Sequence, residues 1–221
     1  MTDLARHDWV RLREGWPRRL LVPLAAWDRA SLEQWLARGR PLVVARALEG
    51  DPPGSVRLGL ALPGRRRIGV VVPSSAVRGR LAPPALEAAL GCAPAGGARW
   101  LRELAARLRA ADVEPAVYGS LAWQHVAADP ALAYVTPESD VDLLVRPSTR
   151  ARAEAALAIL SEAAAAEPVP RLDGELVLPD GAAVAWRELA STAARVLVKT
   201  TATARLIARA EVLGTFGRCA A

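Results

Sequence analysis

The sequence predicts an α+β protein in two parts. A mixed α/β sheet with flanking helices is expected in residues 98–221, preceded by a small domain with a β-hairpin sheet in residues 1–82. Strand-like and helix-like runs alternate in the second part, whereas β-branched runs separated by Pro-Gly turns fill the first. Residues 83–97 (PPALEAALGCAPAGG) are rich in proline, alanine and glycine, and they predict a linker around one helical turn.

Composition points to a folded chain without a membrane segment. Hydrophobic residues make up 52% and charged residues 24% of 221 residues, as in ordinary globular domains. Apolar runs stay far below the ~20 residues that a membrane helix needs. The first twenty residues include three acids and lack the apolar core of a signal peptide. Two cysteines are too few for a disulfide framework or a four-cysteine zinc site. A cytoplasmic protein is therefore expected.

Charge is distributed unevenly between the two parts. Residues 1–97 hold 15 arginines and 8 acids, a net of +7, whereas residues 98–221 have a net of −1. All but one of the 29 basic residues are arginine, and asparagine is absent. This skew resembles a codon bias, so the basic character is weak evidence for nucleic-acid binding, and no nucleic-acid partner is expected. The uneven charge distribution instead predicts two structural units with different functions.

The first part predicts one helix and three strands. Ser31 precedes Gln34 by three residues, the capping-box spacing, so Ser31 is expected to cap a short helix. The predicted elements are the helix Ser31–Ala37 and strands Pro41–Arg46, Val56–Leu62 and Ile68–Val72. Arg65, Arg66 and Arg67 fall at the tip of the hairpin. A solvated turn is the simpler interpretation of this cluster, and an anchor for phosphate or an acidic partner is the functional one.

The second part predicts alternating helices and strands. The predicted elements, in chain order, are helix Trp100–Ala111, strand Ala116–Tyr118, strand Val141–Val145, helix Arg152–Ala166, strands Leu172–Leu178 and Ala182–Trp186 around a Pro-Asp-Gly turn, and a mostly helical Ala190–Val212.

Gly119 and Ser120 follow the first of these strands. A strand that ends in Gly-Ser and opens a helix leaves backbone N–H groups free, and glycine lets a phosphate approach closely. A lone Gly-Ser pair is weak evidence, because such pairs occur in many turns.

Two acidic residues then begin the next strand. Asp140 and Asp142 lie two residues apart, so both carboxylates are expected on one face, roughly 7 Å apart along the chain. A cation is needed to offset their repulsion, and Mg²⁺ suits phosphate substrates. A solvent-facing pair is the alternative, but the preceding Gly-Ser turn favours catalysis.

A third carboxylate is expected on the neighbouring strand. Asp173 and Glu175 alternate there and share a face, and either could accept the proton of an attacking hydroxyl. Asp173 is favoured as the third carboxylate, because a short side chain suits shared metal ligation. Glu175 remains a possible third carboxylate. The simpler interpretation is that both are exposed acids without a role in catalysis.

Together these residues resemble the nucleotidyltransferase fold of the polymerase-beta type. In that fold Gly-Ser holds a triphosphate, Asp-x-Asp binds two magnesium ions and a third Asp lies on a neighbouring strand. The 19 residues between Ser120 and Asp140 depart from the usual spacing. The segment 124–138 is expected to extend the helix and add a loop.

A family that accommodates this gap is similar over most of the chain. The segments Tyr118–Gln124 (YGSLAWQ) and Ser139–Leu144 (SDVDLL), supported by Arg6-His7-Asp8, resemble the malonate decarboxylase holo-[acyl-carrier-protein] synthases, or phosphoribosyl-dephospho-CoA transferases. The resemblance implies transfer of phosphoribosyl-dephospho-CoA from triphosphoribosyl-dephospho-CoA to a serine of the apo acyl carrier protein of malonate decarboxylase, with release of pyrophosphate. Asp140 and Asp142 would bind two Mg²⁺ ions, and Gly119 and Ser120 would hold the pyrophosphate. Asp173 would ligate the metal or help to deprotonate the carrier serine.

Two basic residues of the second part are candidates for donor binding. Lys199 is the only lysine, expected on a helix, and an ammonium suits a phosphate; a surface lysine is the alternative. Arg187, beside Trp186, is a weaker candidate.

Other readings stay open at this point. A nucleotidyltransferase that uses an ordinary NTP on a small molecule, protein or RNA is one alternative, and a non-catalytic module of the same fold is another. Retention of both Asp140 and Asp142 argues against the second, because an inactive site has no need of a repulsive pair.

Overall fold

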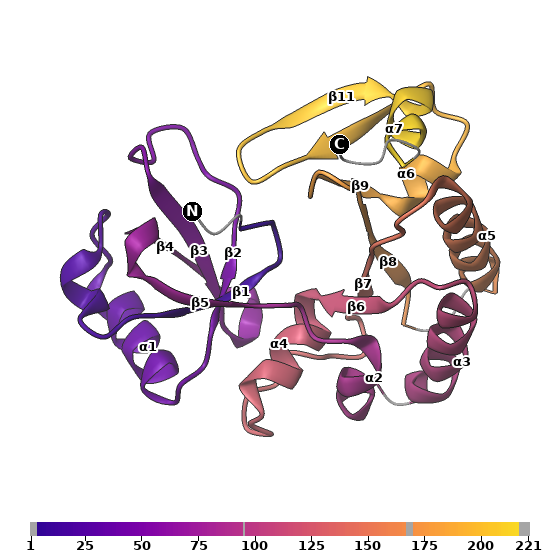
Figure 1. Cartoon of the computed structure of the whole chain (residues 1–221). Coiled ribbons are helices and arrows are strands. Elements are labelled where there is room, and N and C mark those ends of the chain that lie inside the picture. Colours follow the sequence, from indigo (N-terminus) through magenta and orange to yellow (C-terminus); the bar gives the residue numbers. More distant parts are fainter. Residues whose placement is uncertain (1–3, 95, 167–169, 217–221) are drawn as a thin grey trace.

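The computed structural model describes residues 4–94, 96–166 and 170–216, and it contains two β-sheets that lie side by side (Figure 1). The first sheet comes from the N-terminal part of the chain and the second from the C-terminal part. The α+β class with an N-terminal sheet, predicted from the sequence, is confirmed.

The N-terminal sheet is antiparallel, with strand order β4-β3-β2-β1-β5. Its strands are β1 (Trp9–Leu12), β2 (Leu42–Val44), β3 (Ser55–Ala61), β4 (Arg67–Pro73) and β5 (Val77–Leu81). The expected hairpin is β3–β4, and its tip holds the arginine cluster. Strands β1 and β5 were not predicted, because β1 is short and the second half of β5 is exposed arginine and glycine.

Helix α1 (Ala26–Ala37) begins five residues before the predicted start. Ser31 lies inside the helix and does not cap it: its hydroxyl donates to the Trp27 carbonyl at 3.0 Å, one turn back. The capping-box signal was therefore wrong here, because a helical serine can satisfy its hydroxyl on the preceding turn.

The segment expected as a linker packs against the rest of the protein. It contains α2 (Leu86–Ala89), and both Leu86 and Ala89 are fully buried. The Val117 amide donates to the Pro84 carbonyl at 2.8 Å, which ties this segment to the second sheet.

The C-terminal sheet is mixed, with strand order β11-β10-β9-β8-β7-β6. Its strands are β6 (Pro115–Tyr118), β7 (Val141–Val145), β8 (Leu172–Val177), β9 (Ala183–Ala185), β10 (Arg195–Lys199) and β11 (Ala204–Ala208). Strands β7 and β8 are parallel, and the other paired neighbours are antiparallel. One face packs against the helices α3 (Gly97–Ala110), α5 (Arg150–Ala165) and α6 (Trp186–Ala190).

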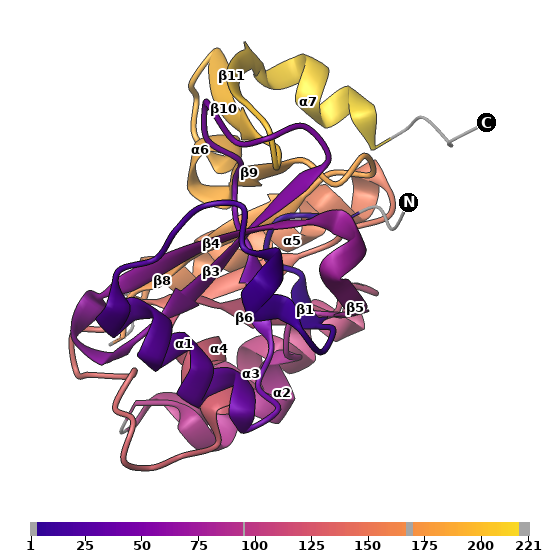
Figure 2. The ribbon, with the colours of Figure 1, turned by 90° about the vertical axis from the view of Figure 1, so that its left-hand side faces the viewer.

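The end of the chain corrects one prediction. Residues 190–212 were expected to be mostly helical, but β10 and β11 form a hairpin and only α7 (Arg209–Thr215) is helical after it. Val196 and Val198 point into the core from alternate positions of β10, and this burial outweighs the helical propensity of the nearby alanines. The hairpin and α7 lie at the opposite end of the molecule from α1 (Figures 1 and 2).

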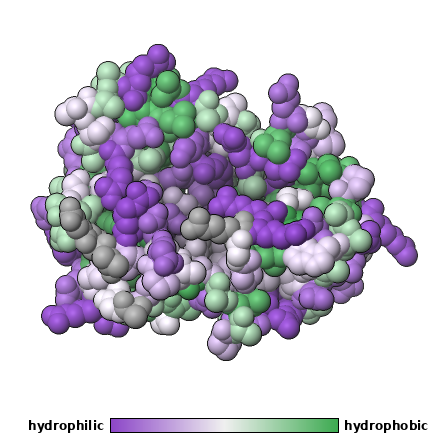
Figure 3. Space-filling model, turned by 180° about the vertical axis from the view of Figure 1, so that it is seen from behind, coloured by the Kyte–Doolittle hydropathy of each residue, from purple (hydrophilic) through white to green (hydrophobic). Residues whose placement is uncertain are grey.

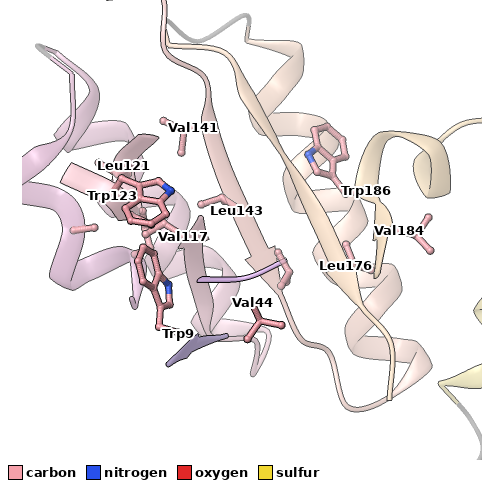
Figure 4. Packing of buried hydrophobic residues seen from close by; sticks show 14 of the residues in the cluster. Trp9, Val44, Val117, Leu121, Trp123, Val141, Leu143, Leu176, Val184 and Trp186 are labelled. Carbon is pink, nitrogen blue, oxygen red and sulfur yellow. The ribbon is translucent and has the colours of Figure 1, made fainter. Parts of the chain in front are cut away.

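A continuous hydrophobic core joins the two sheets. Trp9 of β1 lies against Trp123 of α4 (Gly119–Ala127), with ring centroids 4.6 Å apart in an edge-to-face arrangement (Figure 4). Trp35 of α1 packs on the same Trp123 ring at 5.4 Å. Within the described ranges, no helix has the length and apolar character of a membrane span.

Candidate active site

Three neighbouring strands bring polar side chains to one face of the C-terminal sheet. Tyr118 of β6 is opposite Asp142 of β7, and Asp142 is opposite Asp173 of β8. Residues directly opposite one another in a sheet project to the same face. Leu143, the residue after Asp142 on β7, points to the other face and into the main core, where the helices pack. The candidate carboxylates therefore gather on the face away from α3, α5 and α6.

Gly119 brings the start of α4 against Asp142. A Cβ atom on Gly119 would lie 2.0 Å from Oδ2 of Asp142, so any side chain there would collide with the carboxylate. The backbone of Gly119 is also left-handed, with φ at +63°. No side chain in the described part of the chain caps α4, and half-buried Ser120 lies in its first turn. The amide-rich helix start and the Asp142 carboxylate thus lie next to each other.

Asp142 is surrounded by like charges. Burial, together with the nearby carboxylates of Asp173, Asp140 and Glu175, raises its pKa to about 7. A cation placed against Asp142 would reverse this effect. The site therefore has the electrostatic character of a position that holds positive charge.

Arg171, which was not among the residues predicted from the sequence, already provides part of that charge. Its guanidinium binds the Asp140 carboxylate at 2.8 and 3.1 Å and reaches Asp173 at 3.3 Å. Its place two residues before Asp173, on the same face, was the available signal. The Arg171 guanidinium thus bridges two of the three predicted carboxylates, as a metal ion would.

The donor set fits Mg²⁺ by chemistry. Asp140, Asp142 and Asp173 offer hard carboxylate oxygens, and two of them already share one cation. Among residues 4–94, 96–166 and 170–216, no three His, Cys, Asp or Glu side chains are placed to hold a metal as they stand. Arg171 holds Asp140 and Asp173, so a metal ion would compete with that guanidinium for these oxygens.

Glu175, the alternative third carboxylate, lies in a buried ionic cluster. It is 4% exposed, and its oxygens accept from Lys199 Nζ at 3.0 Å and His7 Nε2 at 3.0 Å. Arg6 lies 3.3 Å away. Burial acts to raise the pKa of Glu175, but the His7 hydrogen bond and the cationic neighbours outweigh it and lower the pKa to about 2.

The N-terminal part of the chain contributes His7 to this cluster. Its ring packs against Tyr118, with centroids 4.3 Å apart. Burial lowers the pKa of His7 more than the hydrogen bond with Glu175 raises it, so the imidazole is neutral near pH 7. Arg6-His7-Asp8 was recognised in the sequence only by its resemblance to the family, because a contact between residues 168 positions apart leaves no local signal.

The two basic candidates have structural partners. Lys199 lies on strand β10, not on the predicted helix, and points to the same face as Glu175. Arg187 donates to the Leu172 carbonyl at 2.6 Å and stacks on Trp186 at 4.5 Å. Their predicted role in donor binding stays a prediction.

The inserted segment between Ser120 and Asp140 continues α4 and then forms a loop. Gln124 accepts from the Tyr134 amide at 2.8 Å, and the Tyr134 hydroxyl donates to Ala61 of β3 at 3.0 Å. Asp129 binds Arg38 at 2.9 Å. The insertion thus fastens α4 to the N-terminal sheet. A pocket of about 790 Å³ lies beside it, lined in part by His125.

Comparison with known proteins places these residues in a family. The family model described as "Phosphoribosyl-dephospho-CoA transferase MdcG C-terminal domain" matches residues 85–210, and the corresponding N-terminal domain model matches residues 5–83. The chain belongs to the phosphoribosyl-dephospho-CoA transferase family. It is accordingly an enzyme, a transferase of the nucleotidyltransferase type.

Curated members of this family are similar over nearly their whole length. A phosphoribosyl-dephospho-CoA transferase of Xanthomonas euvesicatoria is 39% identical over 94% of this chain and 95% of its own length. One of Xanthomonas campestris is 39% identical over 98% and 99%, and one of Bradyrhizobium diazoefficiens is 35% identical over 88% and 86%. The comparison with solved structures found no significant match.

Proposed function

We propose that this protein transfers the phosphoribosyl-dephospho-CoA group from triphosphoribosyl-dephospho-CoA to a serine of the apo acyl carrier protein of malonate decarboxylase, releasing pyrophosphate. The juxtaposition of Gly119 and Asp142 is the observation that carries the proposal. It sets free backbone amides beside a carboxylate whose pKa is raised to about 7 by burial and neighbouring acids. A triphosphate and its counter-ions need this combination of amides and carboxylates.

The proposed roles follow from the positions. The backbone around Gly119 and Ser120 holds the departing pyrophosphate at the start of α4. Asp140, Asp142 and Asp173 hold Mg²⁺, expected as two ions. When bound, Mg²⁺ supplies positive charge that neutralises the phosphate oxygens and stabilises the leaving group. Arg171, freed from Asp140 and Asp173, is then available to bind phosphate.

Asp173 is proposed as a cation ligand in preference to Glu175. Asp173 lies directly opposite Asp142 and is partly exposed, whereas Glu175 is buried and fully engaged by basic groups. Lys199 and Arg187 stay candidates for contacts with the donor. Lys199 is the better placed, because it faces the carboxylate side of the sheet and is 28% exposed.

The activity is tested by mass spectrometry of the apo carrier protein after incubation with enzyme, donor and Mg²⁺. We expect the mass of the phosphoribosyl-dephospho-CoA group to appear on the carrier serine, and pyrophosphate in equal amount. Asp142→Ala should lower the rate by about 10²–10³-fold, since one charge-stabilising group is lost. Transfer of a nucleotide from ATP, with no use of the donor, would favour the alternative nucleotidyltransferase.

The N-terminal domain is proposed to bind the acidic donor or carrier through its net charge of +7 over residues 1–97. Arg66 is stacked on Trp27 at 3.8 Å and bound to Asp28, and Arg67 is exposed. The side chain of Arg65 lies outside the described residues. Replacement of all three arginines by alanine should raise KM for the donor or carrier in a salt-dependent way, and an unchanged KM would exclude this contact. We place the reaction in the cytoplasm.

A further inference from the structure

His7 is held in a strained backbone conformation next to the carboxylate face. Its φ is +68°, a left-handed conformation that is uncommon for residues other than glycine, although histidine adopts it more often than most. Asp8, which is completely buried, enforces it: its Oδ2 accepts from the Ala5 amide at 2.8 Å and pairs with Arg80 Nε at 2.8 Å. Strained residues that the surroundings fix in this way cluster at functional sites.

The hydrogen bond to Glu175 determines the tautomer of His7. An ionised carboxylate only accepts hydrogen bonds, so Nε2 of His7 carries the proton that it donates to Oε2 at 3.0 Å. The ion pairs with Arg6 at 3.3 Å and Lys199 at 3.0 Å hold that carboxylate in its ionised form. Nδ1 of His7 therefore keeps its lone pair, and the side chain is 14% exposed. The ring is therefore an oriented, neutral base with part of its surface exposed.

The His7 ring lies near the strands that carry Asp142 and Asp173. Glu175 lies two residues from Asp173 on the same face of β8, roughly 7 Å along the strand. Tyr118, on which the ring packs, lies directly opposite Asp142. The imidazole of His7 thus contacts two residues, Tyr118 and Glu175, that neighbour Asp142 and Asp173 on the same face of the sheet, and it reaches this place from the N-terminal domain. The other charged groups close to it are Arg6 and Arg146.

We propose that His7, oriented by Glu175, is the general base that accepts the proton of the acceptor serine. This inference rests on the proposed function. As the serine oxygen forms its bond to the α-phosphorus of the donor, its proton passes to Nδ1 of His7. The bond between the α-phosphorus and the oxygen that bridges to the β-phosphorus breaks, and pyrophosphate leaves with the electron pair. The imidazolium is stabilised by the Glu175 carboxylate.

The experiment uses His7→Gly in the full-length enzyme, with transfer to the apo carrier as the assay. Glycine adopts a φ of +68° without strain, so this change preserves the backbone conformation and opens a space for free imidazole. His7→Asn is the non-basic companion, because asparagine tolerates the left-handed region and can still donate a hydrogen bond. Both variants are first compared with wild type by circular dichroism and thermal unfolding.

We expect kcat to fall by about 10²–10⁴-fold in both variants, with a much smaller change in KM for the donor. Imidazole should restore His7→Gly by about tenfold or more, with a rate that rises with the pKa across a series of methylimidazoles. A merely structural role would not produce that dependence on pKa. Asp142→Ala is the matched control, and imidazole should not restore it.

Two results would overturn the inference. One is activity within about threefold of wild type in either variant. The other is a folded, inactive His7→Gly enzyme that no imidazole restores. Failure of the proposed function is separate, because in that case the wild-type enzyme itself does not modify the carrier serine.

Discussion

Asp142 is the residue on which both the electrostatics and the geometry of the site converge. Its carboxylate occupies the position that a side chain on Gly119 would need. Three other carboxylates lie close enough to disfavour its ionisation. A folded protein keeps such an arrangement at a cost in stability, which a bound cation offsets. The consequences of this cost are measurable at single residues.

Gly119→Ala should abolish transfer while leaving the fold intact. The new methyl group would lie 2.0 Å from Asp142 Oδ2 and force the carboxylate away from the helix start. We expect a loss of at least about 10²-fold in kcat/KM, measured by the carrier assay. Gly15→Ala is the control: its φ of +75° imposes similar backbone strain, but nothing lies within 4 Å of the added atom. Equal activity of the two variants would refute the proposed geometry.

Asp142→Asn should stabilise the metal-free protein at neutral pH. The carboxyl ionises near pH 4 when unfolded but near 7 when folded, because it is buried among acids. Between these values the folded state binds more protons, so the free energy of unfolding falls as pH rises, by roughly 2–4 kcal/mol. Asparagine removes that loss.

Urea unfolding near pH 4 and near pH 8 checks this prediction. The variant should match wild type at the lower pH and exceed it at the higher pH. Added Mg²⁺ should raise the stability of wild type but not that of Asp142→Asn. A variant less stable than wild type near pH 8 would contradict the account.

At the scale of elements, the parallel pair β7–β8 sets the spacing of the carboxylates. Gly174 lets the strands approach: a Cβ there would lie 2.2 Å from the Leu143 carbonyl oxygen, and its φ is +144°. The pairing of Asp142 with Asp173 depends on this register. Glycine at this position thus connects strand packing with the site.

Gly174→Ala should destabilise the protein by more than about 2 kcal/mol, because the added atom collides with backbone that cannot move without breaking the ladder. Urea denaturation measures the change. Gly214→Ala in α7 is the matched control, since nothing lies within 4 Å of its new atom, and it should be neutral or slightly stabilising. A neutral Gly174→Ala would show that the strands can separate freely.

Local sequence signals predicted some elements well and others poorly. The strand Val141–Val145 and the hairpin β3–β4 are as expected, since period-two patterns and turn residues act within a few positions. The hairpin β10–β11 was missed because its alanines favour helix locally, while partner strands supply the pairing. Tertiary pairing overrode local propensity there.

At the level of the whole molecule, the N-terminal and C-terminal sheets share one hydrophobic core. Trp123 contacts Trp9 and Trp35 of the N-terminal part, and the amide of Ala47 donates to Thr201 at 2.7 Å. On the face shown in Figure 3, hydrophilic side chains gather around a central hollow. The two parts are therefore expected to unfold together.

Trp123→Ala should lower the free energy of unfolding by about 3–5 kcal/mol, because it removes a large side chain packed between the two sheets. Both sheets should still unfold in one transition. Circular dichroism and tryptophan fluorescence should give coincident urea curves. Trp27→Ala is the control, since Trp27 is 55% exposed and should cost far less. Two separate transitions in wild type would show that the parts are independent.

The α+β class, the Gly-Ser turn, the Asp-x-Asp strand and the neighbouring acidic strand could all be predicted from the amino-acid sequence. These are local patterns of hydrophobicity, turn residues and charge, which act over a few residues. By contrast, the bridge of Arg171 between Asp140 and Asp173, and the contacts of Glu175 with His7 and Lys199, became visible only in the folded protein. Such contacts arise where distant strands and the N-terminal segment meet, so burial and charge there depend on packing that no local pattern encodes.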